Sequence, residues 1–216
     1  MTIEKSIDDK KKVAAVLLDL SKAFDNASHE KILDKCASIG IRGMGLNWLK
    51  SYLHERKFYI QIGDNKSENK SIGKGVPQGG LLSPMLFNIY LSDYERTIES
   101  RCIQYADDTT NLLEDDSELM LDEEIIRNYE SSRKYFYEND LSLNQSKTEI
   151  IKFQKSERSS IRIMSSKTII SSKLKFLGLN INASLAENDH VSTYSTLGTQ
   201  RQLIVLRIVS QSHGMS

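Results

Sequence analysis

The sequence predicts an α+β fold, in which an antiparallel sheet carries helices packed on one face. Three observations lead to this class. The expected elements follow as strand, helices, hairpin, helix, two strands, helix and further strands, and not in strict strand–helix alternation. A long amphipathic helix over residues 117–139 directly follows two short strand segments. The chain has 216 residues, of which 39% are hydrophobic, and this is enough for one good core.

Each element has its own signal. Residues 13–18 (VAAVLL) form an apolar run typical of a buried strand, and helical spacing follows on either side of a glycine cluster. Pro84 stands where the first turn of a helix tolerates proline. The first half is expected to contain a strand (13–18), two helices (29–39, 46–53), a hairpin (58–62 with 71–75, around Gly63-Asp64-Asn65) and a helix (about 84–98). The second half is expected to contain strands (102–106, 109–113), the long helix (117–139), further strands (148–154, 161–164, 168–171, 174–181) and a last helix (196–210).

The charges bear on possible partners. With 29 basic and 29 acidic side chains the net charge is zero, which is weak evidence against nucleic-acid binding. The distribution is uneven, because residues 114–124 are strongly acidic while residues 147–175 carry eight Lys and Arg. The basic run indicates either a nucleic-acid face or an ordinary solvated surface. No apolar stretch fits a signal peptide or a membrane span, so we expect an intracellular protein, in the nucleus or cytoplasm.

One pair of carboxylates stands in an unusual place. Of three Asp-Asp pairs, only Asp107-Asp108 lies between two apolar-containing strand segments. Like charges ~4 Å apart repel by about 4 kcal/mol near a protein surface, and a divalent cation relieves this. A polar hairpin turn is the simpler explanation of an isolated pair. Asp19, however, ends the most hydrophobic strand, where an unpaired carboxylate is costly. If that strand lies beside the 102–113 hairpin, three carboxylates meet at one sheet edge and suit Mg²⁺.

The segment GVPQGGLLSP at 75–84 is the third candidate element. Pro77 stiffens its entry, and Gly79 and Gly80 allow a ligand to approach the backbone closely. Gln78 offers one acceptor and two donors in the same gap. The segment indicates either a ligand-binding loop or a plain junction between a loop and a helix.

These segments together resemble a known family. LDLSKAFD (18–25), GVPQGGLLSP (75–84) and YADD (105–108), in this order and at these separations, resemble the three central motifs of reverse transcriptases. The surrounding stretches are closest to non-LTR retrotransposons of the LINE or jockey type. LSLNQSKTEIIKF (141–153) resembles the family's next motif, and KFLGLNI (175–181) resembles its primer grip. Gly80 and Ser83 differ from the Ser and Gly of many relatives, in a form also seen in group II intron enzymes.

The resemblance implies roles for individual residues. Asp19, Asp107 and Asp108 are the expected catalytic carboxylates and metal ligands, and Lys147 is expected to protonate the pyrophosphate leaving group. Phe24 is expected to pack under the incoming sugar. The alternatives are that Phe24 is an ordinary core aromatic and that Lys147 is an ordinary surface lysine. The remaining expected contacts are to the nucleotide (Gln78, Gly79) and to the primer (Phe176, Leu177, Gly178).

The resemblance also implies a fold and an activity. It implies a polymerase palm with a ferredoxin-like antiparallel sheet over residues 1–182, with the fingers mostly missing, and a truncated thumb-like segment over 183–216. The implied reaction adds nucleotides from deoxynucleoside triphosphates to a DNA primer on an RNA template. It is expected to use two Mg²⁺ ions, for which Mn²⁺ can substitute. No membrane is expected to take part. Only 18 residues precede Asp19, so the alternative is an inactive retrotransposon remnant that at most binds nucleic acid.

Overall fold

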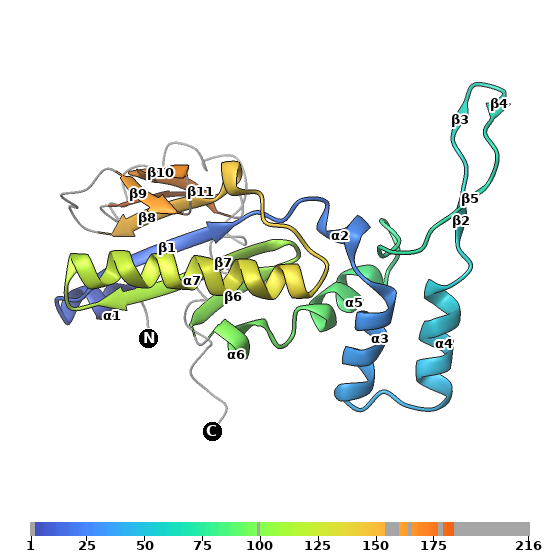
Figure 1. Ribbon diagram of the computed structural model, residues 1–216, viewed down its shortest axis with the longest axis horizontal. Coiled ribbons are helices and arrows are strands. Elements are labelled where there is room, and N and C mark those ends of the chain that lie inside the picture. Colours follow the sequence, from blue (N-terminus) through green and yellow to red (C-terminus); the bar gives the residue numbers. More distant parts are fainter. Residues whose placement is uncertain (1–2, 99, 154–159, 164–165, 177–178, 184–216) are drawn as a thin grey trace, which may run out of the picture. The chain divides into compact units, whose positions relative to one another are not determined.

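The computed structural model describes residues 3–98, 100–153, 160–163, 166–176 and 179–183 (Figure 1). The chain divides into two compact units. The first contains residues 1–17, 110–129 and 148–216, and the second contains residues 18–109 and 130–147. The chain passes between the units several times, so each is assembled from segments that are distant in sequence.

A six-stranded sheet contains most strands of the first unit, while its edge strand over residues 101–105 belongs to the second unit. Its order is β6-β7-β1-β8-β10-β9. The strands are β1 (Lys12–Leu18), β6 (Arg101–Tyr105), β7 (Asp108–Asp115), β8 (Glu149–Phe153), β9 (Ser160–Ile163) and β10 (Ser166–Ser171). The pairs β1–β8 and β9–β10 are antiparallel, as predicted, whereas β8 and β10 run parallel. The predicted α+β class is therefore confirmed, with one parallel pair inside a mainly antiparallel sheet.

Strand β1 lies in the interior of this sheet. Its residues 13–16 are buried without alternation, which is typical of a strand covered on both faces. Helix α7 (Glu118–Glu138) places Leu121, Ile125 and Tyr129 in the core at four-residue spacing.

Helix α7 is held on the sheet by polar contacts from two strands. Asn111 of β7 donates a 2.6 Å hydrogen bond to Asn128 of the helix. The ammonium of Lys152 in β8 lies 2.6 Å from the carboxylate of Asp122. It also lies 3.0 Å from the carboxylate of Glu118, one turn earlier on α7. The helix therefore covers the sheet face from which both strand side chains project (Figure 1).

Two further features of this unit differ from the sequence prediction, and a third prediction falls on residues outside the described part. A short helix, α1 (Ile3–Asp8), precedes β1 and had no sequence signal. The single strand predicted at 174–181 is wrong, because β11 (Lys173–Phe176) and β12 (Leu179–Asn182) form an antiparallel pair. The predicted helix at 196–210 lies outside the described residues.

The second unit is mainly helical. It contains α2 (Ala23–Asn26), α3 (His29–Ser38), α4 (Met44–Leu53), α5 (Ser83–Tyr90), α6 (Tyr94–Ile98) and the end of α7. Ser28 caps α3 by accepting from the amide of Lys31. The centre of the unit is aromatic and aliphatic, and its largest fully buried members are Ile32, Leu53, Leu86, Phe87, Tyr90, Leu91, Tyr94, Phe136 and Leu141. No helix in the described part of the chain is long and apolar enough to cross a membrane.

The helix predicted over 84–98 is broken into α5 and α6, and a lysine explains the break. The ammonium of Lys35 donates to the carbonyl of Tyr90 at 2.6 Å, so this carbonyl does not serve the next helical turn. The amide of Tyr94 bonds instead to the carbonyl of Leu91. A tertiary contact thus replaces the helical hydrogen bond that the apolar pattern led us to expect.

The predicted hairpin is present but its pairing is different. The ladders are β2 (Lys57–Phe58) with β5 (Lys70–Ser71), and β3 (Gln61–Ile62) with β4 (Asn65–Lys66). The predicted pairing of 58–62 with 71–75 is wrong. Gly63, at φ 59°, allows a two-residue turn, so the return strand begins at Asn65. All residues from 57 to 71 are exposed, and we call this segment the arm.

Candidate active site

A strained turn presents two of the candidate carboxylates. Ala106 and Asp107 connect β6 to β7, and Asp108 is the first residue of β7. Ala106 has a left-handed backbone (φ 55°), which costs a non-glycine residue roughly 1–2 kcal/mol. Thr109 and Thr110 are buried immediately afterwards. The chain is therefore fixed on one side of the turn, while Asp107 is half-buried and Asp108 is exposed.

Asp19 follows β1 and lies within electrostatic range of this turn. Although its side chain is exposed, partial desolvation raises the pKa of Asp108, and the negative charges of Asp107 and Asp19 raise it further. The three carboxylates that the sequence singles out are thus close enough for each ionised group to oppose the ionisation of Asp108.

Lys147 lies near Asp19, although it belongs to the last segment of the second unit in sequence. The amide of Ser21 bonds to the carbonyl of Ser142 at 2.9 Å, and the amide of Asn144 bonds to the carbonyl of Asp19 at 2.8 Å. The 3₁₀ turn η1 (Gln145–Lys147) then places the Lys147 Nζ atom 3.6 Å from Asp19 Oδ2. The Lys147 side chain is 66% exposed, so solvent screens this ion pair.

A backbone clamp joins GVPQGGLLSP to the end of α2. The amide of Gly75 donates to the carbonyl of Ala27 at 2.7 Å, and the amide of Val76 donates to the carbonyl of Phe24 at 2.8 Å. The ring nitrogen Nε2 of the buried His29 lies 2.7 Å from the Gly75 carbonyl oxygen. Gly75 has φ 88°, and a Cβ atom there would lie 2.7 Å from the carbonyl oxygen of Asp25. Only glycine fits this position.

The clamp holds two predicted nucleotide contacts on neighbouring segments. The ring of Phe24 is half-buried and stacks on Phe87, with centroids 4.5 Å apart. Gln78 is exposed, and its Nε2 atom donates a 2.8 Å hydrogen bond to Asp25 Oδ1. Gly79, at φ 80°, has open space where a side chain would begin. The sequence alone assigns no role to Asp25. Its position directly after Phe24 in LDLSKAFD is the one signal that could have indicated a role.

The donor chemistry of the acidic turn fits a divalent cation. Oxygen-only ligands suit Mg²⁺, which keeps several of its waters and so needs few protein ligands. Desolvation raises the pKa of Asp108 most, and the negative charges of Asp107 and Asp19, which a cation would offset, raise it further. Among the described residues no group of three His, Cys, Asp or Glu is already arranged around one position.

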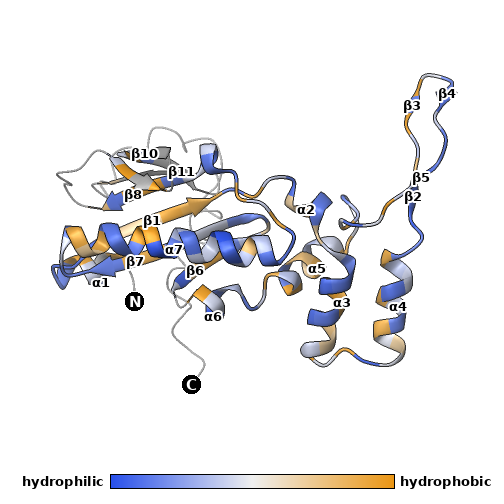
Figure 2. Cartoon of the chain, viewed as in Figure 1, coloured by the Kyte–Doolittle hydropathy of each residue, from blue (hydrophilic) through white to orange (hydrophobic). Residues whose placement is uncertain are grey.

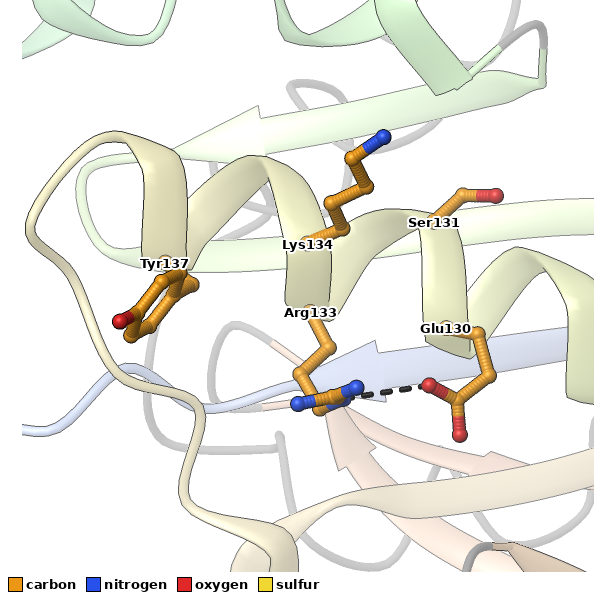
Figure 3. A pocket seen from close by; sticks show the side chains of 5 residues that line it. All are labelled: Glu130, Ser131, Arg133, Lys134 and Tyr137. Atoms are coloured by element: carbon orange, nitrogen blue, oxygen red, sulfur yellow. Dashed lines mark hydrogen bonds and ion pairs between the residues drawn. The ribbon is translucent and has the colours of Figure 1, made fainter.

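Other predicted or visible features lie apart from these residues. Phe176 ends β11 in the first unit, while Leu177 and Gly178 lie outside the described residues. A shallow pocket on α7 is lined by Glu130, Ser131, Arg133, Lys134 and Tyr137, and Glu130 pairs with Arg133 at 3.1 Å across it (Figure 3). The pocket includes none of the predicted site residues.

Sequence comparison places the chain among polymerases of mobile elements. Residues 2–181 match the family described as "Reverse transcriptase (RNA-dependent DNA polymerase)". The RNA-directed DNA polymerase from mobile element jockey of Drosophila melanogaster is 34% identical over 41% of this chain and 10% of that protein. Its namesake from Drosophila funebris is 23% identical over 87% of this chain and 22% of that protein. The chain therefore spans about a tenth to a fifth of these relatives.

Solved structures share the fold. A truncated apo telomerase from Candida tropicalis aligns with a TM-score of 0.62 and 14% identity, over 84% of this chain and 37% of that one. Telomerase from the same organism in complex with a TWJ fragment of telomeric RNA aligns with a TM-score of 0.56 and 14% identity, over 85% and 31%.

Proposed function

The chain belongs to the reverse transcriptase (RNA-dependent DNA polymerase) family, and from this premise we propose that it supplies the catalytic palm of an RNA-directed DNA polymerase. The reaction adds a deoxynucleotide to the 3′-hydroxyl of a primer opposite a template. The observation that supports the proposal is the pair of adjacent carboxylates, Asp107 and Asp108, at the β6–β7 turn, with Asp19 within electrostatic range of Asp108. The description of the matching family as RNA-dependent DNA polymerases supports RNA as the template.

Asp19, Asp107 and Asp108 are the residues that would hold two divalent cations, Mg²⁺ or Mn²⁺. Such ions, when bound, lower the pKa of the attacking hydroxyl and neutralise charge on the transferred phosphate and on the pyrophosphate. The protein's own contribution at the turn is geometric. The left-handed Ala106 and the buried Thr109 and Thr110 hold the two adjacent carboxylates at a fixed place before the reaction.

Lys147 is proposed as the proton donor to the departing pyrophosphate. Its ammonium lies 3.6 Å from Asp19 Oδ2, where it partly neutralises the carboxylate in the absence of other cations. With Asp19 engaged by a cation, the Lys147 ammonium would lose this partner and would be free to reach the phosphates. The side chain is exposed and attached to a short 3₁₀ turn, so this movement breaks no buried contact.

Phe24, Gln78 and Gly79 are proposed to line the nucleotide position. Phe87 supports the ring of Phe24 from behind by stacking, so the ring presents a fixed steric limit where a 2′-hydroxyl would extend. The open space at Gly79 lets a ligand approach the backbone, and Gln78 is held beside it by Asp25. Phe176, Leu177 and Gly178 are proposed to contact the primer strand.

The test is primer extension by Asp107→Asn, with this chain joined to the remaining segments of a jockey-type relative. We expect extension on an RNA template to be abolished while primer–template binding is nearly unchanged, because affinity comes mainly from basic contacts to phosphates. Asp34→Asn, an exposed acid on α3, is the matched control and should leave extension intact. Extension by the Asp107 variant at close to the original rate would refute the assignment.

A further inference from the structure

Helix α4 carries an aromatic stripe on its exposed side. Met44, Trp48 and Tyr52 recur at four-residue spacing, and Arg56 continues the series just beyond the helix. The rings of Trp48 and Tyr52 stack with centroids 5.6 Å apart and planes 14° apart. The guanidinium of Arg56 lies 5.8 Å from the centre of the Tyr52 ring. We call these four residues the α4 stripe.

The stripe is not part of the core. Leu49 and Leu53, on the other side of the helix, are buried, whereas Met44 is 89% exposed and Trp48 is 56% exposed. Stacking of residues four apart contributes about 0.2–0.5 kcal/mol to a helix. This small gain does not account for two large aromatic rings in contact with solvent.

The inner end of the stripe lies against the candidate active site. A Cβ atom added to Gly80 would lie 2.9 Å from the hydroxyl of Tyr52, so the tyrosine touches the loop that carries Gln78 and Gly79. A ligand that follows the stripe from Trp48 to Tyr52 therefore arrives at the proposed nucleotide position. All of these residues lie in the second unit.

The surroundings of the stripe are basic and unusually apolar. Residues 42–57 contain four Lys and Arg and one Glu, in a chain whose net charge is zero. Of the thirteen large hydrophobic side chains that are exposed in the described part, nine lie between residues 39 and 85. Figure 2 shows hydrophobic residues on α4 and, separately, on the β3 side of the arm. Exposed aromatic rings within a basic surface are typical of sites that bind single-stranded nucleic acid.

We propose that the α4 stripe binds unpaired bases of the template strand and leads them to the active site. The proposal rests on the polymerase function proposed above and names a surface for one of its partners. Only unpaired bases expose the faces needed to stack on Trp48 and Tyr52, and in a primer–template complex such bases belong to the template beyond the primer end. Arg56 and Lys50 supply positive charge for the phosphates of the same strand.

The stripe contains its own reporter, because Trp48 is the single tryptophan of the chain. The 216-residue chain is titrated with a 12-nucleotide single-stranded oligo(A) RNA and, separately, with a 12-base-pair duplex. We expect the single strand to quench Trp48 fluorescence and to bind at least tenfold more tightly than the duplex. Binding should weaken with added salt. Saturation by the single strand without any change in Trp48 emission would overturn the proposal.

Three variants test the role of the ring, with binding followed by polarisation of a labelled RNA. Trp48→Leu should weaken binding roughly five- to hundredfold, the range for loss of one stacked base, and Trp48→Phe should recover much of it. Tyr137→Leu removes an aromatic ring on α7 that is 78% exposed and should change binding less than twofold. Circular dichroism confirms that each variant is folded. Equal affinity of Trp48→Leu and the unchanged chain would contradict the proposal.

The outcomes separate this inference from the polymerase function. If Asp107→Asn abolishes extension but Trp48 variants bind RNA normally, the stripe proposal fails and the polymerase proposal stands. If Trp48 variants lose RNA but the fused protein does not extend primers, the polymerase proposal fails and the surface assignment stands. A Trp48 emission that depends on protein concentration and ignores RNA would identify a protein interface and overturn the proposal.

Discussion

The side-chain amide of Gln78 donates a 2.8 Å hydrogen bond to Asp25 Oδ1. The two residues are 53 positions apart, and both are exposed. The backbone bonds from Gly75 and Val76 to α2 bring their segments together. The orientation of the residue proposed to touch the incoming nucleotide is therefore set by a side chain on a different element.

Removing this partner should weaken nucleotide binding. In Asp25→Ala the Gln78 amide loses its fixed acceptor, and a hydrogen bond of this kind contributes about 0.5–1.5 kcal/mol. We expect KM for deoxynucleotides to rise roughly two- to tenfold with little change in kcat. Asp25→Asn keeps an acceptor oxygen and serves as the control. Steady-state primer extension measures both constants, and an unchanged KM for Asp25→Ala would show that Gln78 does not depend on this bond.

Phe24→Ala should admit ribonucleotides. Truncation of the ring opens the space in which a 2′-hydroxyl would clash, so discrimination in kcat/KM between deoxy- and ribonucleotides should fall. Phe87→Leu disturbs the same stack from the other side but leaves the Phe24 ring in place. Competition between the two nucleotide types measures the ratio. If the two variants discriminate equally, Phe24 acts only by packing.

Gly75→Ala should destabilise the second unit more than other glycine substitutions. The new Cβ would lie 2.7 Å from the Asp25 carbonyl oxygen, at a positive φ as well. Gly63→Ala has a positive φ but open space, and Gly73→Ala has neither problem. Urea unfolding should give losses in the order 75, 63, 73, with more than about 2 kcal/mol at Gly75. Similar values at all three positions would mean that the clamp is not tightly packed.

Asp108→Asn should stabilise the protein at neutral pH in the absence of divalent cations. Burial and the carboxylates of Asp107 and Asp19 raise the Asp108 pKa above its ordinary value of 3.8. The folded protein then holds this proton more tightly than the unfolded chain, so stability falls as pH rises from 3.8 through the raised pKa. The asparagine variant lacks this loss. Its advantage should therefore be present at pH 7 and vanish below pH 3.8.

Unfolding in EDTA across this pH range measures the difference, with Asp34→Asn as the control. If the difference in unfolding free energy between Asp108→Asn and the unchanged chain is the same at every pH, the three charges are too far apart to interact. The same variant should lose polymerase activity. Stability and activity would then change in opposite directions at one residue.

The sequence predicted the elements that are governed by local pattern. The apolar run at 13–18 and the periodicity at 117–139 each lie within one residue of β1 and α7 at both ends. The break between α5 and α6 could not be predicted, because it depends on a hydrogen bond from Lys35, which lies 55 residues earlier. The pairing within the arm depends on the backbone conformation at Gly63, which the residue type permits but does not determine.

The candidate site shows the same division. The family resemblance implied roles for Asp19, Asp107 and Lys147. In the structure Asp19 lies within electrostatic range of Asp108 and 3.6 Å from the Lys147 ammonium. The bond between Asp25 and Gln78 and the stacking of Trp48 on Tyr52 had no counterpart in the motif analysis. Both are tertiary or surface relationships, and an exposed aromatic residue in a helix carries no distinctive sequence pattern.

The backbone clamp has a consequence for how such a site can evolve. Its bonds from Gly75 and Val76 to α2 join main-chain atoms, so they do not depend on the side chain at position 24. If Phe24 sets the sugar preference as proposed, a lineage can change that preference through a single codon change while these main-chain bonds persist. Gly75 has no such freedom. On the proposed role of Phe24, selection on substrate choice acts at position 24, and the requirement for an intact backbone clamp acts at Gly75.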